Sequence, residues 1–209
     1  MTHTRATDGL HVTSMNSIVY IRIKNIVATY VGIAVTLFLV GNPLFDIRIN
    51  VRIIKISRYG GKIMITYVIG DLLKSPADVL VNTVNTVGVM GKGIANDFKK
   101  IYPEMFTQYQ KLCEKGLFNI GQLWIFKTKN KWVLNFPTKK HWRNPSKIEY
   151  IEAGLDKFVK TYAEKGITSI SFPMLGCGNG ELNWETEVRP LMEKYLKNIP
   201  IDIYILNYS

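Results

Sequence analysis

Residues 64–209 alternate between two patterns of hydrophobic and polar positions. Short runs rich in Val, Ile, Thr and Phe, which favour strands, are separated by longer segments in which apolar residues recur at helical spacing. Strands interleaved with helices predict an α/β fold, in which a sheet lies between helical layers. We expect strands at 65–69, 78–84, 121–126, 132–136, 168–172 and 201–206, and helices at 93–101, 103–115, 148–165 and 184–196.

One connection predicts the type of sheet. Only residues 127–131 join the expected strands at 121–126 and 132–136. A crossover between parallel strands needs a dozen residues or more, so these two strands are expected to be antiparallel. Because the other strands alternate with helices, the sheet is predicted to be mixed.

The first 63 residues have a different pattern. No charged residue occurs in 25–45, and 26–40 is almost wholly apolar, which is near the length needed to cross a bilayer. Basic residues flank this segment, and if it crosses a membrane the positive-inside rule places the following domain in the cytoplasm. They are Arg22 and Lys24 before it, and Arg48, Arg52, Lys55, Arg58 and Lys62 after it.

The alternative is that residues 1–63 are translated ahead of the natural start. Met64 opens directly on the first expected strand, and 64–209 has the usual size of one domain. Residues 1–63 contain 8 Lys and Arg against 2 Asp and Glu, whereas 64–209 contain 19 against 14. We expect an N-terminal extension at 1–63 and one domain at 64–209, and the pattern leaves open whether the extension is a membrane anchor.

Two glycine-rich loops each follow an expected strand and precede an expected helix. We call residues 88–93 the first glycine loop and residues 176–180 the second glycine loop. Such turns present unpaired N–H groups and the positive end of a helix dipole, which suit a phosphate. The spacing fits neither the Walker motif nor the dinucleotide fingerprint, and a plain tight turn is the alternative for the first loop alone. Two such loops at the carboxyl ends of strands are expected to hold one diphosphate between them.

Cysteine and histidine are scarce in the sequence. Cys113 and Cys177 are the only cysteines, and His141 is the only histidine after residue 63, so we expect no metal site and no cofactor. Unclustered cysteines favour a reducing, cytoplasmic setting. Cys177 is either a nucleophile or, more simply, a small apolar residue between glycines. The chain is expected to act as a monomer.

Several segments together resemble the macrodomain family, which binds ADP-ribose. They are Gly70-Asp71-Leu72, Asn82-Thr83-Val84-Asn85 and the two glycine loops. More narrowly, NTVNTVGVMGKGIA, from residue 82, together with NFPTKKHWR, from residue 135, is similar to the macrodomain of DarG. That antitoxin removes ADP-ribose from thymidine in DNA, and the terminal ADP-ribose protein glycohydrolase is its relative. The resemblance covers essentially all of 64–209 and implies a three-layer α/β/α macrodomain with ADP-ribosyl glycohydrolase activity.

The resemblance also implies which residues bind the ligand. Asp71 corresponds to the family carboxylate that accepts a hydrogen bond from the adenine amino group, and a helix N-cap is the alternative role. Asn85 corresponds to the asparagine at the distal ribose, where it is counted with the catalytic residues, and a turn-forming asparagine is the alternative. The other implied ligand contacts are Leu72, Gly88, Val89, Met90, Gly91, Lys92, Gly93, Thr138, Gly176, Cys177, Gly178, Asn179 and Gly180.

Lys139 is the catalytic residue that the resemblance implies. In the relatives, the lysine at this position acts at the anomeric carbon of the distal ribose. A lysine can attack there if burial or neighbouring cations, such as Lys140 and Arg143, keep its amine deprotonated. A basic surface loop is the alternative interpretation of this segment.

One position departs from the protein-directed relative. That relative carries an aspartate in the second glycine loop, whereas this chain has Gly180 there, as DarG-like sequences do. Protein-linked ADP-ribose is therefore the less favoured substrate, and Glu181 cannot be assumed to replace the aspartate.

Trp142 lies among His141, Lys140 and Arg143. This pattern is typical of sites where an aromatic face holds an unstacked base and cations follow the phosphates. A half-buried packing tryptophan is the alternative. The partners implied are ADP-ribose or ADP-ribosylated single-stranded DNA, and a cognate ADP-ribosyltransferase toxin.

Three functions remain open at this stage. The first is an ADP-ribosyl glycohydrolase acting on nucleic acid, which the lysine-containing segment favours. The second is a phosphatase or deacetylase acting on ADP-ribose 1″-phosphate or O-acetyl-ADP-ribose. The third is a reader that binds ADP-ribose without turning it over.

Overall fold

The computed structural model describes residues 4–5, 11–15, 18–23, 26–31, 33–36, 52–59 and 62–207, with side chains from 65 to 206. The chain divides into two compact units, Met1–Ile56 and Ser57–Ser209. In the first unit, β1 (Thr4–Arg5), β2 (His11–Met15), β3 (Ile18–Ile23) and β4 (Ile26–Val31) pair antiparallel in chain order. There, β5 (Ile33–Thr36) also pairs antiparallel with the beginning of β6 (Arg52–Tyr59).

The apolar segment at 25–45 contains β4 and β5, and its remaining residues and all its side chains lie outside the described part of the chain. Among the helices that the structure describes, none is long and apolar enough to cross a membrane. The expectation of a membrane anchor therefore concerns a segment of which the structure describes only the backbone of β4 and β5.

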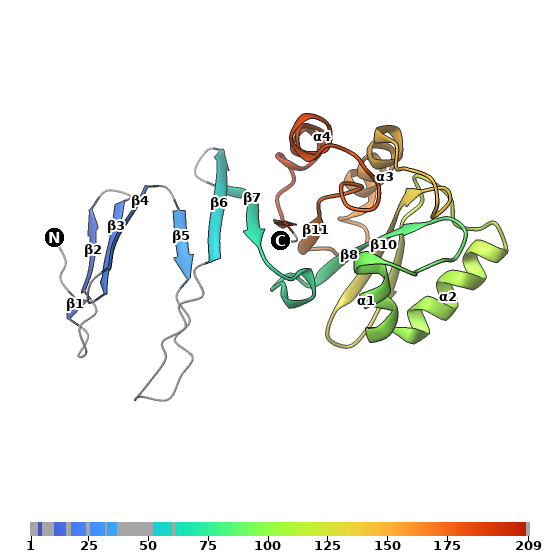
Figure 1. Ribbon diagram of the computed structural model, residues 1–209, viewed down its shortest axis with the longest axis horizontal. Coiled ribbons are helices and arrows are strands. Elements are labelled where there is room, and N and C mark those ends of the chain that lie inside the picture. The colour runs from blue at the N-terminus through green and yellow to red at the C-terminus, as the bar shows by residue number, and fades with distance from the viewer. Residues whose placement is uncertain are drawn as a thin grey trace. The chain divides into compact units, whose positions relative to one another are not determined.

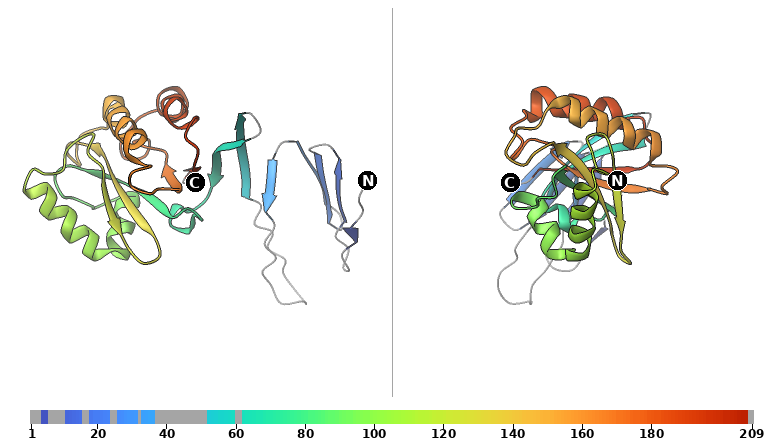
Figure 2. Two further views of the ribbon diagram at one scale, coloured as in Figure 1. Left: turned by 180° about the vertical axis from the view of Figure 1, so that it is seen from behind. Right: turned by 90° about the vertical axis from the view of Figure 1, so that its right-hand side faces the viewer.

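The second unit has three layers, which confirms the predicted α/β/α architecture. Figure 1 shows α1 and α2 on one face of the central sheet and α3 and α4 on the other, and the right panel of Figure 2 shows the same layers from the side. The helical elements are η1 (Leu72–Lys74), α1 (Gly93–Ile101), α2 (Pro103–Glu114), α3 (Ile148–Thr161), the π-helical turn η2 (Trp184–Val188) and α4 (Arg189–Leu196). The strands are β7 (Lys62–Ile69), β8 (Val79–Asn85), β9 (Trp124–Lys127), β10 (Trp132–Lys139), β11 (Ser169–Pro173) and β12 (Asp202–Asn207).

The strands of this unit follow the order β7-β12-β11-β8-β10-β9. The pairs from β7 to β10 are parallel, and β9 pairs antiparallel with β10, so the mixed sheet is confirmed. Within β8 and β10, the paired residues Asn82 and Asn135 are fully buried, and the Asn82 amide donates to Asn135 Oδ1 at 2.9 Å. A hydrogen-bonded polar pair in an apolar layer disfavours other registers, because a slip would leave both amides unpaired.

Several element ends differ from the sequence prediction. The strand expected at 132–136 continues to Lys139, and the strand expected from residue 65 begins at Lys62. The helix expected from residue 184 begins with the π-helical turn, in which the Val188 N–H donates to the Asn183 carbonyl oxygen at 3.1 Å and the Asn183 side chain caps the Thr186 N–H. The strand expected from residue 121 begins only at Trp124.

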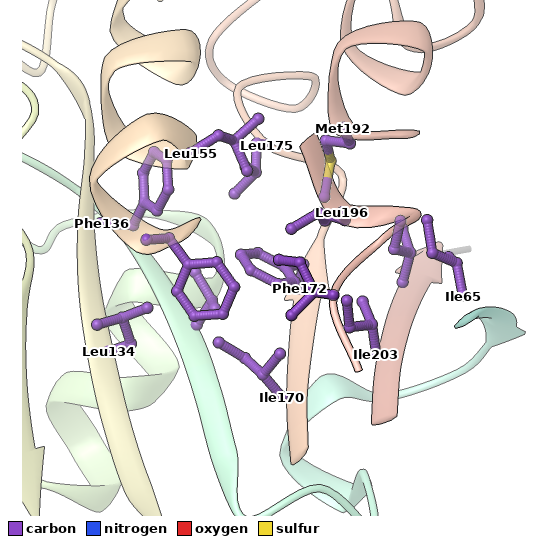
Figure 3. Close-up of a cluster of buried hydrophobic side chains, with 14 of the residues drawn as sticks. Ile65, Leu134, Phe136, Leu155, Ile170, Phe172, Leu175, Met192, Leu196 and Ile203 are labelled. Atoms are coloured by element: carbon purple, nitrogen blue, oxygen red, sulfur yellow. The ribbon is translucent and has the colours of Figure 1, made fainter. Parts of the chain in front are cut away.

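Two hydrophobic clusters fill the spaces between the layers. One joins the sheet to α3 and α4, and Figure 3 shows its side chains from β10, β11, β12 and both helices. The other joins the opposite face of the sheet to α1 and α2. In the first cluster Gly154 of α3 lies directly over the Phe136 ring, since a Cβ built at Gly154 would lie 2.1 Å from its Cζ. Because glycine has no side chain, α3 packs closely against β10, the strand that ends at Lys139.

A chain beginning at Met64 is expected to unfold cooperatively on heating. Residues 57–63 belong to the second unit and β6 is hydrogen-bonded to β7, so this chain loses that pairing. The pairing of β7 with β12 begins at Thr66 and Ile65 is the first core residue described, so the buried core is kept without residues 1–63. Calorimetry of this chain and of one beginning at Ser57 should give closely similar melting temperatures. Aggregation of the Met64 chain, together with rescue by residues 46–63, would place the boundary further upstream.

Candidate active site

The predicted site residues meet at one edge of the central sheet. Because β7, β11, β8 and β10 are parallel, their carboxyl ends share this edge, where ligands bind in open α/β sheets. Asp71 follows β7, the second glycine loop follows β11, Asn85 ends β8 and Lys139 ends β10. From β7 to β10 there are four strand spacings, roughly 19 Å at about 4.8 Å each. The edge therefore suits an elongated ligand with different groups at its two ends.

Lys139 and Asn85 are register partners on the adjacent parallel strands β10 and β8. The register shifts between Pro137 and Lys139, so Thr138 forms a bulge just before the lysine. Bulges re-aim the side chain that follows them, and they are common beside active sites. The two residues expected to be catalytic are thus next to each other.

Asn85 organises the beginning of the first glycine loop. Its side chain is buried, and its Oδ1 accepts from the N–H groups of Val87 at 3.0 Å and Val89 at 3.3 Å. Its Nδ2 donates to the Val89 carbonyl oxygen at 2.6 Å. Asn85 therefore also acts as a turn-forming residue, which was its alternative role. The second N–H of its side-chain amide remains available to a ligand hydroxyl.

The first glycine loop presents backbone donors. Within the described part of the chain, the N–H groups of Met90, Gly91 and Lys92 donate to no protein acceptor. Lys92 is the N-cap of α1 and makes no side-chain cap, so the first turn of that helix is also uncapped. Gly88 and Gly93 have φ of 79° and 58°, values that favour glycine. Unpaired N–H groups beside a helix N-terminus form an anion site.

The second glycine loop supplies matching donors and lies against the first. In the described structure, the N–H groups of Gly178, Asn179 and Gly180 donate to no protein acceptor. A Cβ built at Gly93 would lie 2.9 Å from Asn179 Nδ2, so the two loops touch there. The two strands below them, β11 and β8, pair with each other only through Ile170 with Val79 and Ser171 with Leu80, and beyond these residues each pairs only with its other neighbour. The expected arrangement, in which two loops face each other across one diphosphate site, is consistent with this geometry.

Lys139 lies beside the second glycine loop, where its ammonium donates to the Asn179 carbonyl oxygen. Burial lowers the pKa of Lys139 below the ordinary lysine value, and the Glu181 carboxylate opposes this shift. The lowering comes from burial, not from Lys140 or Arg143, which the sequence had suggested as neighbouring cations. The ammonium of Lys140 lies 5.9 Å from the centre of the Tyr150 ring instead.

Asp71 combines two roles. Its Oδ1 accepts from the Leu73 N–H at 2.9 Å, and it is the N-cap of η1, as the alternative interpretation expected. Its Oδ2 lies 3.6 Å from the Lys74 ammonium, and the side chain is 34% exposed. A carboxylate has about four lone-pair sites, so an adenine amino group can still be bound.

Some of the expected ligand residues have inward-facing side chains. Leu72 and Met90 have buried apolar side chains, so their backbones are the groups that can bind a polar ligand, and the Thr138 side chain is buried as well. Burial raises the pKa of the Cys177 thiol to about 11, and the thiol donates to the Leu175 carbonyl oxygen at 3.5 Å. A thiol that stays protonated is a poor nucleophile, which favours the apolar interpretation of Cys177.

Three residues that support the site were not expected from the sequence. The Tyr109 hydroxyl donates to the Asn85 carbonyl oxygen at 2.7 Å from α2. Ser146 is buried, its N–H donates to the Gly180 carbonyl oxygen at 2.9 Å, and its hydroxyl has no partner in the described structure. Glu181 has φ of 67°, unusual for a residue with a side chain. Of the three, only Glu181 could have been found from the sequence, because its carboxylate directly follows the second glycine loop.

Gly180 has no room for a side chain. A Cβ built there would lie 2.3 Å from both the Gly176 carbonyl oxygen and Ser146 Oγ. At Gly178, in contrast, no atom of the described structure lies within 4 Å of such a Cβ. Groups of His, Cys, Asp and Glu that could hold a metal ion do not occur among the described residues.

The chain is similar to proteins of one known family. The Macro domain family matches residues 81–191. The DNA ADP-ribosyl glycohydrolase of Mycobacterium tuberculosis is 49% identical over 146 residues, which are 68% of this chain and 42% of the relative. The human ADP-ribose glycohydrolase OARD1 is 30% identical over 148 residues, 68% of this chain and 91% of that protein.

A solved structure shows the same fold. Thermosipho africanus DarTG in complex with ADP-ribose superposes with a TM-score of 0.66 at 38% identity, covering 69% of this chain and 41% of that one. The chain thus spans about two-fifths of the length of the mycobacterial relative. The chain belongs to the macrodomain family.

Proposed function

We propose that this chain hydrolyses the bond between ADP-ribose and a nucleobase in DNA. The observation that carries the proposal is Lys139, a lysine whose pKa is lowered by burial, in register with Asn85 at the carboxyl edge of the sheet. The mycobacterial relative is named a DNA ADP-ribosyl glycohydrolase, and the Thermosipho relative was solved with ADP-ribose. A protein that only reads ADP-ribose has no need of a lysine with a lowered pKa at this position.

The order of groups along the edge gives the orientation of the ligand. Asp71 supplies an acceptor for the adenine amino group, and the two glycine loops supply N–H donors for the diphosphate. The distal ribose then lies at Asn85 and Lys139, at the other end of the edge. The anomeric carbon of this ribose is one end of the bond that must break.

The chemistry follows from a neutral amine at that position. The Lys139 nitrogen attacks the anomeric carbon, and the bond to the base breaks with its electron pair leaving on the base, which takes up a proton. Water then releases the ribose from the lysine, so the net reaction consumes one water and gives ADP-ribose and unmodified base. Nucleophilic catalysis splits one difficult displacement into two easier steps.

The second glycine loop supports DNA over protein as the acceptor. The loop has no space for a carboxylate side chain at Gly180, because the Gly176 carbonyl and Ser146 hydroxyl occupy its position. The resolving aspartate of the protein-directed relative therefore has no equivalent there. Because the substrate must be made by an enzyme that attaches ADP-ribose to DNA, we propose an ADP-ribosyltransferase as the functional partner.

The direct test offers three substrates in parallel to the whole chain. They are single-stranded DNA carrying ADP-ribose, protein carrying ADP-ribose, and ADP-ribose 1″-phosphate. Release of ADP-ribose from the DNA alone is expected. Consumption of the phosphate alone would make the chain a phosphatase, and binding without turnover of any substrate would make it a reader.

Lys139→Ala is expected to leave ADP-ribose affinity within about tenfold but to lower turnover by on the order of a thousandfold. The reason is that the adenine and diphosphate contacts come from other residues, whereas the amine acts in the transition state. Lys139→Arg should be nearly as slow, because a guanidinium stays protonated. Calorimetry gives the affinity, and ADP-ribose release from DNA gives the turnover.

Lys140→Ala is the matched control, since it removes the next amine in the chain. An inactive Lys140→Ala beside an active Lys139→Ala would transfer the role to Lys140. Full activity of both variants on DNA-linked ADP-ribose would rule out the lysine mechanism.

Glu181→Gln is expected to move the pH dependence of turnover to lower pH. The neutral amine is the reactive form, so the rate rises as pH increases through the pKa of Lys139. The Glu181 carboxylate raises that pKa, and its removal therefore lowers the midpoint of the rise. A pH–rate profile measures this midpoint, and a midpoint that stays or moves to higher pH would show that Glu181 does not act on the amine.

Gly180→Ala is expected to lower the free energy of unfolding by about 1–3 kcal/mol, the usual cost of forcing atoms into a packed site. Gly178→Ala should change it by less than about 0.5 kcal/mol, because its Cβ meets open space. Chemical denaturation of the two variants without ligand makes the comparison. Equal stabilities would mean that the loop accommodates a side chain at residue 180.

A further inference from the structure

The segment after Lys139 is fastened to Thr86, just after β8, and to the second glycine loop. At its beginning, the Lys140 carbonyl oxygen accepts from the N–H of Thr86 at 3.2 Å and from its hydroxyl at 2.8 Å. At its end, the Ser146 N–H donates to the Gly180 carbonyl oxygen at 2.9 Å. Thr86 directly follows Asn85, so the segment crosses the side of the site where the distal ribose is expected. A group attached to the anomeric carbon must leave the site past this segment.

Three consecutive side chains of the segment form a stack, which we call the 141–143 column. The rings of His141 and Trp142 are 5.5 Å apart at 27°, and the guanidinium carbon of Arg143 lies 4.3 Å from the centre of the Trp142 ring. The Arg143 N–H also donates to His141 Nδ1 at 3.3 Å. The planes are therefore held in order before any ligand binds.

The column is exposed to solvent. Trp142 is 44% exposed and belongs to neither hydrophobic cluster, which favours a contact surface over a packing role. Arg143 is exposed as well. An exposed aromatic ring carrying a stacked guanidinium suits a flat, anionic partner, because bases stack on both kinds of plane and the phosphates are attracted to the cation.

We propose that the 141–143 column stacks an unpaired base of single-stranded DNA next to the modified nucleotide. This proposal rests on the proposed function, because it concerns the DNA that carries the ADP-ribose. A base inside a duplex has both faces covered by its neighbours, so the column selects single-stranded substrate. Prior stacking of the three side chains lowers the entropy lost when the base is added.

The test compares two single-stranded oligonucleotides carrying the same ADP-ribosylated base. In one, the nucleotides on either side are intact, and in the other they are abasic, so that only the neighbouring bases are missing. The wild-type chain is expected to have kcat/KM about tenfold higher on the intact oligonucleotide, a typical effect of stacking one base. Trp142→Ala should be about tenfold slower than wild type on the intact oligonucleotide and equal to wild type on the abasic one.

Further variants separate stacking from charge and from general damage. Trp142→Phe keeps an aromatic ring and should recover most of the kcat/KM on the intact oligonucleotide. Arg143→Lys keeps the charge but loses the stacking plane, so it should lose part of the preference for the intact over the abasic oligonucleotide. Leu117→Ala removes another exposed apolar side chain and should behave as wild type on both oligonucleotides. ADP-ribose affinity, measured by calorimetry, should be the same in Trp142→Ala and wild type.

The outcomes distinguish the two proposals. If wild type releases ADP-ribose equally well from both oligonucleotides, or if Trp142→Ala slows both to the same extent, the column does not stack a neighbouring base. If wild type acts on neither oligonucleotide but acts on protein or on ADP-ribose 1″-phosphate, the proposed function fails and the column proposal fails with it.

Discussion

The site depends on the register between β8 and β10. That register sets Lys139 opposite Asn85, and the buried hydrogen bond between Asn82 and Asn135 fixes it a few residues earlier. Each strand position occupies roughly 3.3 Å, so a slip by one residue would move Lys139 from Asn85 and turn its side chain to the other face. A buried polar pair thus positions Lys139 against Asn85 from a few residues away.

Much of the fold could be predicted from local patterns. The first helix begins at Gly93 and ends at Ile101 as expected, because a glycine turn precedes it and apolar residues recur at helical spacing until Pro103. The antiparallel β9 and β10 followed from a connection too short for a crossover. The carboxyl edge as a meeting place for Asp71, the glycine loops and Lys139 also followed, because it is a general consequence of parallel strands.

Other features depend on contacts between distant residues. Pro137 lacks an N–H and predicts the end of a strand, yet β10 continues to Lys139. Its pairing with β9 stops at Asn135, so beyond that residue β10 has a free edge where a missing donor is tolerated. The support from Tyr109 and Ser146 could not be inferred either, because each bonds a residue far from it in sequence: Asn85 lies 24 residues from Tyr109, and Gly180 lies 34 residues from Ser146.

The crowding around Gly180 limits how the sequence can change. The space that a side chain at residue 180 would need is filled by Ser146 Oγ and the Gly176 carbonyl oxygen. Substitutions at residues in contact are not additive, so an acidic residue at 180 becomes acceptable only together with a smaller residue at 146 and a shifted loop. Each of these substitutions made alone is expected to lower stability. Any evolutionary path that brings an acidic residue to position 180 would therefore have to cross a barrier of epistasis that originates in the Ser146 hydroxyl and the Gly176 carbonyl.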